Sequence, residues 1–223
     1  MHSELNDIAY VPTTGVRRAH ELPVVLASEE TLKGYGCLVD DPHSFPIEVV
    51  RWPASGWREI DPNSGDQGGV TEGLFEFWWK QGTLYATNNA VGDSYLFGWS
   101  DWPEELARTD QSRGAAPAPR ERVHIWRANY HPDGGQLFYP LNRQRFLVPL
   151  ALPGDDVSPG SFVAFYCSGE RGLYIHPNIW HGAVVPFDDH AQFLDRQSRV
   201  HARVSVDFAK EFGCYITVPL REA

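Results

Sequence analysis

Two histidines, His176 and His181, are the residues best placed to do chemistry, because they stand on either side of a Pro-Asn pair between two apolar strands. In an unbroken strand, residues five apart would point to opposite faces of the sheet. Pro177 fixes φ and Asn178 tolerates the left-handed region, so the chain can turn between the two histidines. The pattern predicts two imidazoles that point into one pocket. The alternative is one surface histidine and one that is hydrogen-bonded in the core.

A buried positive charge is expected at Arg127, which lies in the apolar run Ile-Trp-Arg-Ala-Asn. A guanidinium partly inside a protein needs an anion. That anion is either a ligand carboxylate or an internal aspartate, and Asp207 on another apolar strand is the internal candidate. The sequence leaves both interpretations open.

Tyr139 and Gln144 form a second pair that is five residues apart across a turn, as the two histidines are. Two such strand pairs facing each other resemble the way in which cupin barrels assemble a pocket. Asn178 is interpreted mainly as a turn former, and Trp180 as either a barrel wall or a lid over the pocket.

Composition indicates short strands joined by turns, because the 223 residues include 20 glycines, 17 prolines and 13% aromatic residues. The formal net charge of −10 argues against nucleic acid or an anionic membrane as a partner. A small anionic substrate is compatible with this charge, since local arginines would be enough to bind it.

The three cysteines are far apart and predict neither a disulfide framework nor a zinc site. The sequence shows no export signal and no run of 18 apolar residues. A cytoplasmic location is therefore expected.

The predicted fold class is all-β: a cupin-like double-sheet β-barrel, or jelly roll, with a few short helices. The expected organisation is an N-terminal arm over residues 1–22 and a single barrel domain over 23–223. Loop insertions are expected near 52–75 and 101–122, the second as a mobile loop or lid. A tryptophan cluster is expected to fill core or a subunit interface rather than to form a binding platform: Trp52, Trp57, Trp78, Trp79, Trp99 and Trp102.

A longer motif surrounds the two histidines: Gly169-Glu-x-Gly172-x-x-x-His176-x-Asn178-x-Trp180-His181. It resembles the signature of the ureidoglycolate lyase family, a cupin-fold group. Weaker matches are Leu32-x-x-Tyr35-Gly36, Trp126-Arg127-Ala128, the segment from Pro140 to Pro149 that contains Gln144, and a late strand with Asp207. Together the matches extend over roughly residues 28–220.

This resemblance implies a carbon–nitrogen lyase that cleaves ureidoglycolate to glyoxylate and urea, acts as a homodimer and uses a divalent metal such as Ni, Mn or Zn. Gln144 and His181 would be the metal ligands. The chain departs from the family pattern at Tyr139, where the family usually has a histidine, and at Gly182, which replaces a second histidine. One expected metal ligand is therefore missing.

Cleavage of such a substrate needs a base, an acid and an anchor for its carboxylate. Histidine, with an unperturbed pKa of ~6.5, can transfer protons in either direction at neutral pH. His181 or His176 is predicted as the base, with the other histidine or Tyr139 as the acid. Arg127 or Arg145 would hold the carboxylate by a two-point contact. Further substrate contacts are assigned to Gln144, Asn178, Trp180 and Asp207.

Two other functions are compatible with the sequence. One is a non-catalytic cupin that binds a small acid or sugar. The other is a cupin isomerase or epimerase that acts on a sugar acid, for which the tryptophan-rich segment is the argument.

Overall fold

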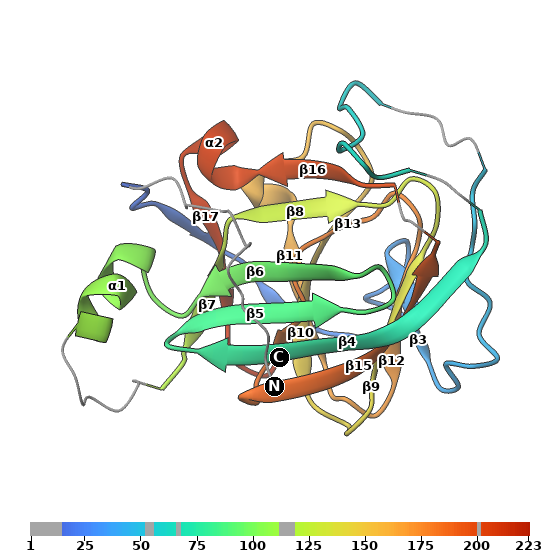
Figure 1. Ribbon diagram of the computed structural model, residues 1–223, viewed down its shortest axis with the longest axis horizontal. Coiled ribbons are helices and arrows are strands. Elements are labelled where there is room, and N and C mark those ends of the chain that lie inside the picture. Colours follow the sequence, from blue (N-terminus) through green and yellow to red (C-terminus); the bar gives the residue numbers. More distant parts are fainter. Residues whose placement is uncertain (1–14, 52–55, 66–67, 112–118, 200–201) are drawn as a thin grey trace.

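The computed structural model describes residues 15–51, 56–65, 68–111, 119–199 and 202–223. Within these residues the chain forms two β-sheets and two short α-helices (Figure 1). The predicted all-β class with two sheets and a few short helices is confirmed. None of the helices in these residues is both long and apolar enough to cross a membrane.

The larger sheet has ten strands in the described residues, and all neighbours are antiparallel except β1 and β17. In spatial order it consists of β1 (Ala19–Glu21), β17 (Tyr215–Pro219), β7 (Arg122–Ile125), β6 (Asp93–Trp99), β5 (Thr83–Asn88), β4 (Val70–Lys80), β15 (His190–Ser198), β9 (Gln136–Pro140), β12 (Gly172–Ile175) and β3 (Gly36–Val39).

The smaller sheet has seven strands in the same part of the chain. Its order is β16 (Val204–Asp207), β8 (Arg127–Tyr130), β13 (Trp180–His181), β10 (Phe146–Ala151), β11 (Val163–Cys167) and β2 (Val24–Leu26), with β14 (Val185–Pro186) also paired to β10. Helix α1 (Pro103–Gln111) precedes β7, and α2 (Phe208–Phe212) links β16 to β17.

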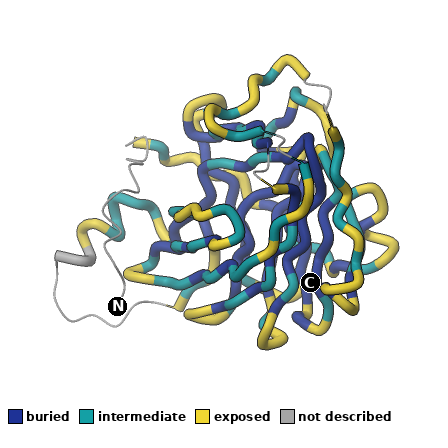
Figure 2. The backbone as a smooth tube through the Cα atoms, turned by 45° about the vertical axis from the view of Figure 1, so that its right-hand side comes forward, coloured by how far each residue is buried: buried dark blue, intermediate teal, exposed yellow. Residues whose placement is uncertain are grey.

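The hydrophobic core lies between the sheets, where the buried strand segments gather in Figure 2. Phe193 on β15 has its ring centroid 5.5 Å from that of Phe77 on β4 and 5.0 Å from that of Phe146 on β10, both in edge-to-face geometry. These rings come from both sheets. Edge-to-face aromatic packing of this kind holds the two layers together.

Several local expectations are modified by the structure. Ala19–Glu21 of the expected arm adds a strand to β17, while residues 1–14 lie outside the described residues. The expected loop over 101–122 contains helix α1, and the loop over 52–75 ends at Val70, where β4 begins.

Gly36 allows two strands to approach closely. It is the partner of Ile175 in the β3–β12 pair. A Cβ atom at this position would lie 1.8 Å from the backbone oxygen of Tyr174. Backbone cannot move aside as a flexible side chain can, so only glycine fits without displacing a strand.

We expect Gly36→Ala to lower the free energy of unfolding by about 1–3 kcal/mol, because the new methyl group overpacks the β3–β12 pair. Urea unfolding followed by circular dichroism measures the effect. Gly160→Ala is the matched control, since the nearest atoms to a Cβ there are 3.9 Å away. Equal stability of the two variants would contradict the explanation.

Candidate functional site

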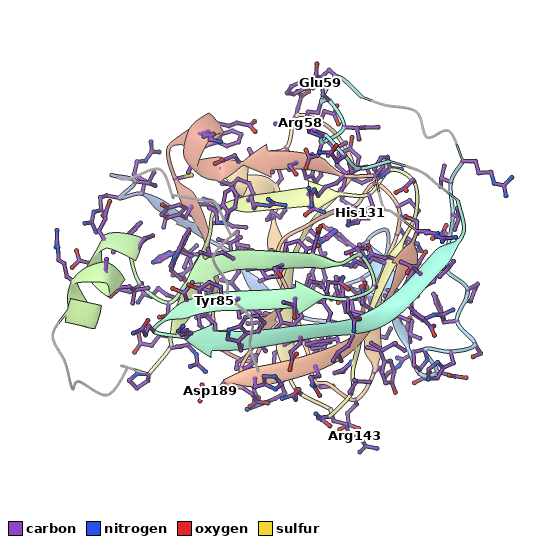
Figure 3. All side chains as sticks on the ribbon, in the orientation of Figure 1. Arg58, Glu59, Tyr85, His131, Arg143 and Asp189 are labelled. Carbon is purple, nitrogen blue, oxygen red and sulfur yellow. The ribbon has the colours of Figure 1, made fainter. Side chains whose placement is uncertain are left out.

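A cavity between the two sheets is lined by polar side chains from both of them. Four of these side chains come from the smaller sheet or from the residue that follows β8: Arg127, Asn129, His131 and His181. Three come from the larger sheet: Asn88, Gln136 and Gln197. Aromatic rings complete the wall, from Phe75, Tyr95, Phe97 and Phe138. Figure 3 shows His131 beside the end of β8, well inside the outline of the molecule.

Strand alternation explains which residues of β8 reach the cavity. Successive side chains of a strand point to opposite faces, so Arg127, Asn129 and the following His131 share one face. All three line the cavity. His181 on β13 is the register partner of Asn129 and therefore points to the same face.

The two imidazoles of the cavity are held in a defined tautomer. The ring centroids of His131 and His181 are 5.1 Å apart. Asn129 Nδ2 lies 3.3 Å from His131 Nε2 and 3.2 Å from His181 Nε2. The Nδ1 atoms lie 2.8 Å from the Ala202 carbonyl and 3.3 Å from the Gly182 carbonyl. Because carbonyl oxygens only accept, each Nδ1 carries a proton, and because Asn129 Nδ2 only donates, each Nε2 is the acceptor nitrogen.

Arg127 brings a positive charge to the cavity. Its guanidinium stacks 5.1 Å from the ring centroid of Trp126, and in the described part of the chain it forms no hydrogen bond or ion pair with a carboxylate. Burial lowers the pKa of Arg127, and the nearby charge of Arg203 lowers it further. Arg203 has its own partner, since its Nε lies 2.7 Å from Asp61 Oδ2. Arg127 is therefore placed to bind an anion.

A buried carboxylate orients the amides of the larger sheet. Asp195 is fully buried. It accepts hydrogen bonds from Gln136 Nε2 at 2.7 Å, Asn88 Nδ2 at 2.9 Å and Gln197 Nε2 at 2.5 Å. Burial raises the pKa of Asp195 from its ordinary value of 3.8 to about 6, although the three N–H donors act in the opposite direction.

His176 lies outside this cavity, so the structure does not bring it together with His181. Its side chain is 43% exposed and its Nδ1 lies 2.9 Å from Glu48 Oε2. Tyr174, two residues earlier, contacts the ring of His176 edge-on and donates to the same Glu48 oxygen. Alternation along β12 thus carries His176 to the same side as Tyr174, away from the core that contains Ile175.

Alternation also places Tyr139 away from the cavity. Phe138 lines the cavity, and Tyr139, one residue later on β9, points to the opposite face, where its hydroxyl donates to the Asp40 carbonyl at 3.2 Å. The expected partnership of Tyr139 with His181 is therefore not formed. Gln136, three residues before Tyr139, is the β9 residue that supplies a polar group to the cavity.

Gln144 and Arg145 lie in the turn before β10, at the surface. Gln144 Nε2 donates to Asp188 Oδ2 at 3.1 Å and to the His190 carbonyl at 2.6 Å. Arg145 stacks on Phe187 and pairs with the exposed Glu222. Figure 3 shows the neighbouring Arg143 at the lower edge of the molecule, far from His131. Neither Gln144 nor Arg145 is among the residues that line the cavity.

The three remaining predicted residues make contacts that support the fold: Asn178, Trp180 and Asp207. Asn178 adopts a φ of 66°, as a turn former does. Trp180 is buried on the face of β13 opposite to His181, and its Nε1 donates to the Gly154 carbonyl at 2.8 Å. Asp207 caps α2 by accepting from Lys210 N at 3.0 Å and pairs with the Lys210 ammonium, so it is not the ion-pair partner of Arg127.

The tryptophan cluster stays out of the cavity wall. Trp99 belongs to a small core cluster with Trp126 and Tyr215, and Trp102 stacks on His124. Trp57 is 66% exposed, and Trp52 lies outside the described residues. None of the tryptophans that the structure describes lines the cavity.

The described residues do not bring together the metal ligands that the family resemblance implies. Gln144 and His181, the predicted ligands, are not brought together. In the described ranges no group of three or more His, Cys, Asp or Glu side chains could hold an ion. The cavity offers two imidazoles, but its buried carboxylate, Asp195, is already engaged by three N–H donors. Protein metal sites generally need at least three ligands.

Five residues in or beside the cavity were not predicted from the sequence: His131, Asn129, Gln136, Gln197 and Asp195. A signal was present for the first two, because Arg127, Asn129 and His131 recur at every second position of an otherwise apolar strand. A polar stripe of period two on a buried strand indicates a face that lines a polar cavity.

The fold and the cavity define a two-sheet all-β protein with imidazole, guanidinium and amide groups facing one another. Residues 111–209 match the family model described as ureidoglycolate lyase. The predicted resemblance to that family is confirmed over this range, which is narrower than the expected 28–220. The matched range includes His131, His181, Asp195 and Arg127, whereas strands β4, β5 and β6 precede it.

The individual relatives that match the chain are also named as ureidoglycolate lyases. The chain is 39% identical over 64 residues to the ureidoglycolate lyase of Stutzerimonas stutzeri, covering 29% of this chain and 38% of that protein. It is 38% identical over 64 residues to ureidoglycolate lyase 2 of Rhizobium meliloti, covering 29% and 39%. It is 33% identical over 90 residues to an Escherichia coli ureidoglycolate lyase, covering 40% and 56%. The chain thus spans between 38% and 56% of the length of these relatives.

We expect Asp195→Asn to change how stability depends on pH. The pKa of Asp195 is raised to about 6 in the folded state, so its contribution is fully favourable below its ordinary value of 3.8 and is lost as the pH rises through about 6. Relative to Asp195→Asn, the wild type should lose on the order of 3 kcal/mol of unfolding free energy between about pH 4 and pH 7.

Urea unfolding at several pH values measures this difference. Asp188→Asn is the matched control, because Asp188 also accepts from a glutamine amide but lies near the surface. A difference between wild type and Asp195→Asn that stays flat with pH would show that burial does not raise the pKa of this group.

Proposed function

We propose that the protein is a lyase that cleaves ureidoglycolate to glyoxylate and urea. The observation that carries the proposal is the convergence of His131, His181 and Arg127 on one cavity. The similarity of residues 111–209 to the ureidoglycolate lyase family, and the names of the relatives, support the same reaction.

The substrate carboxylate binds to Arg127. A guanidinium forms two parallel hydrogen bonds with a carboxylate, and such charge-assisted contacts are about twice as strong as neutral ones. Arg203 adds a second positive charge to the same wall, partly offset by Asp61. Because burial disfavours an uncompensated charge, the bound carboxylate also relieves the cost of placing Arg127 there.

Proton transfer belongs to His181, with His131 beside it. Nε2 of His181 takes the proton of the substrate hydroxyl, and the carbonyl of glyoxylate forms. The carbon–nitrogen bond breaks with its electron pair on nitrogen, and this nitrogen receives the proton from the imidazole. His181 returns to its neutral form, so protons and electrons balance. His131, linked to His181 through Asn129, is the second imidazole on the proton path.

This assignment keeps His181 and Arg127 from the sequence analysis and gives His131 the place expected for His176 or Tyr139. Asn178, Trp180, Gln144, Arg145 and Asp207 receive no catalytic or substrate-binding role, because their contacts lie elsewhere. No step runs through a metal ion, since the expected ligands Gln144 and His181 are not brought together.

A homodimer and a cytoplasmic location are carried forward as part of the proposal. The cysteines Cys37, Cys167 and Cys214 are all unpaired, as they would be in a reducing compartment. The dimer is supported by the resemblance to the family alone.

We expect His181→Ala to lower kcat for ureidoglycolate cleavage by about 10²- to 10⁴-fold, because the base is removed. Release of glyoxylate, coupled to a reductase that consumes it, measures the rate. His190→Ala is the control, since His190 is half exposed, pairs with Glu76 and does not line the cavity. His176→Ala separates the two assignments: a loss as large as that of His181→Ala would favour the sequence-based pair. A wild type without activity would refute the proposed function.

We expect Arg127→Met to raise KM for ureidoglycolate by about 10- to 100-fold, because a charge-assisted contact with the carboxylate is lost. Steady-state kinetics measure KM. Arg143→Met is the control, since Arg143 is 77% exposed and pairs with Glu170. An unchanged KM in Arg127→Met would show that another group anchors the substrate.

A further inference from the structure

Two glutamine side chains of the larger sheet line the cavity, and the side-chain oxygen of each is buried without a hydrogen-bond donor from the part of the chain that the structure describes. Gln136 is 4% exposed and Gln197 is 1% exposed, and both line the cavity. Among the described residues, no donor reaches Gln136 Oε1 or Gln197 Oε1. Buried amide oxygens without a partner are rare in proteins, because their desolvation is not compensated.

Asp195 fixes the orientation of both amides. An ionised carboxylate can only accept, so the NH₂ group of each glutamine must turn toward it. The observed contacts are Gln136 Nε2 to Asp195 Oδ1 at 2.7 Å and Gln197 Nε2 to Asp195 Oδ2 at 2.5 Å. Asn88 Nδ2 donates the third hydrogen bond to Asp195, and the side-chain oxygen of Asn88 accepts from the backbone N–H of Ala90. The two glutamine oxygens are therefore turned away from Asp195 and kept as acceptors.

A ligand that matches these acceptors must present N–H donors. Ureido, amidinium and guanidinium groups all do so. The charge of the ligand distinguishes these three groups. Among the described residues, Asp195 is the only carboxylate found at these amides, and it is already hydrogen-bonded to them. Arg127 and Arg203 line the same cavity. A cationic group would be repelled by the arginines, so a neutral ureido group fits best.

Building on the proposed activity, we propose that Gln136 and Gln197, oriented by Asp195, form a subsite that recognises the ureido end of the substrate. Arg127 binds the carboxylate end. Asp195 is a positioning residue, since it acts on the ligand only through the two amides. The subsite thereby distinguishes a carbamoylated acid from a simple hydroxy acid of the same charge.

The test is ligand binding by calorimetric titration, which does not depend on turnover. N-carbamoylglycine carries the ureido group and the carboxylate but lacks the hydroxyl that the reaction requires. Guanidinoacetate has the same shape with a cationic end, and glycolate has the carboxylate without the N–H groups. The wild type should bind N-carbamoylglycine at least about tenfold more tightly than either of the other two.

Asp195→Asn should weaken N-carbamoylglycine binding by about tenfold or more and change glycolate binding by less than about twofold. The asparagine presents one NH₂ group to the amides, so one glutamine must flip and offer a donor where the ligand needs an acceptor. Asp188→Asn, which makes the same change beside Gln144 outside the cavity, should alter neither affinity. Thermal unfolding monitors whether each variant is folded.

Gln136→Met and Gln197→Met provide a second test if Asp195→Asn does not fold. Each substitution removes one acceptor at similar side-chain volume and should weaken the binding of N-carbamoylglycine but not that of glycolate. Folded variants that bind N-carbamoylglycine as the wild type does would overturn the subsite, even if ureidoglycolate is cleaved. Selective, Asp195-dependent binding in a protein that does not cleave ureidoglycolate would uphold the subsite and refute the proposed activity.

Discussion

A carboxylate buried between two hydrophobic sheets is stable only when its oxygens are hydrogen-bonded, and this constraint organises the interior of the protein. Asp195 meets it through Asn88, Gln136 and Gln197, which come from three different strands. The three amides cannot rotate without leaving the carboxylate unpaired. The larger sheet therefore presents a fixed pattern of polar atoms to the cavity. Apolar side chains at the same positions would have filled this space as part of the core.

The two sheets contribute different chemistry to the same space. The smaller sheet supplies the imidazoles of His131 and His181 together with the Arg127 guanidinium, and the larger sheet supplies neutral amides. A small acid with an uncharged N–H-bearing end can contact both layers at once. Because each layer is a rigid sheet, the distances between these groups are set by packing rather than by flexible loops.

Alternation along the strands explains why several predicted residues lie elsewhere. His176 follows Tyr174 to the outer side of β12, and Tyr139 lies on the face of β9 opposite to Phe138. A spacing of five across a turn was compatible with convergence but could not establish it. The face that each residue takes depends on strand registers that form only with distant partners.

The sequence by itself determined the all-β class and the family resemblance around His181, because turn residues, apolar alternation and a short motif are local properties. It did not reveal β15, whose buried face changes from Ala191 and Phe193 to Asp195 and Gln197 and so breaks the apolar pattern. Only the tertiary structure decided which polar groups meet, since they come from strands far apart in the chain. The strand that holds the buried carboxylate could not be predicted from its local pattern, because polar residues there are stable only with partners that folding brings to them.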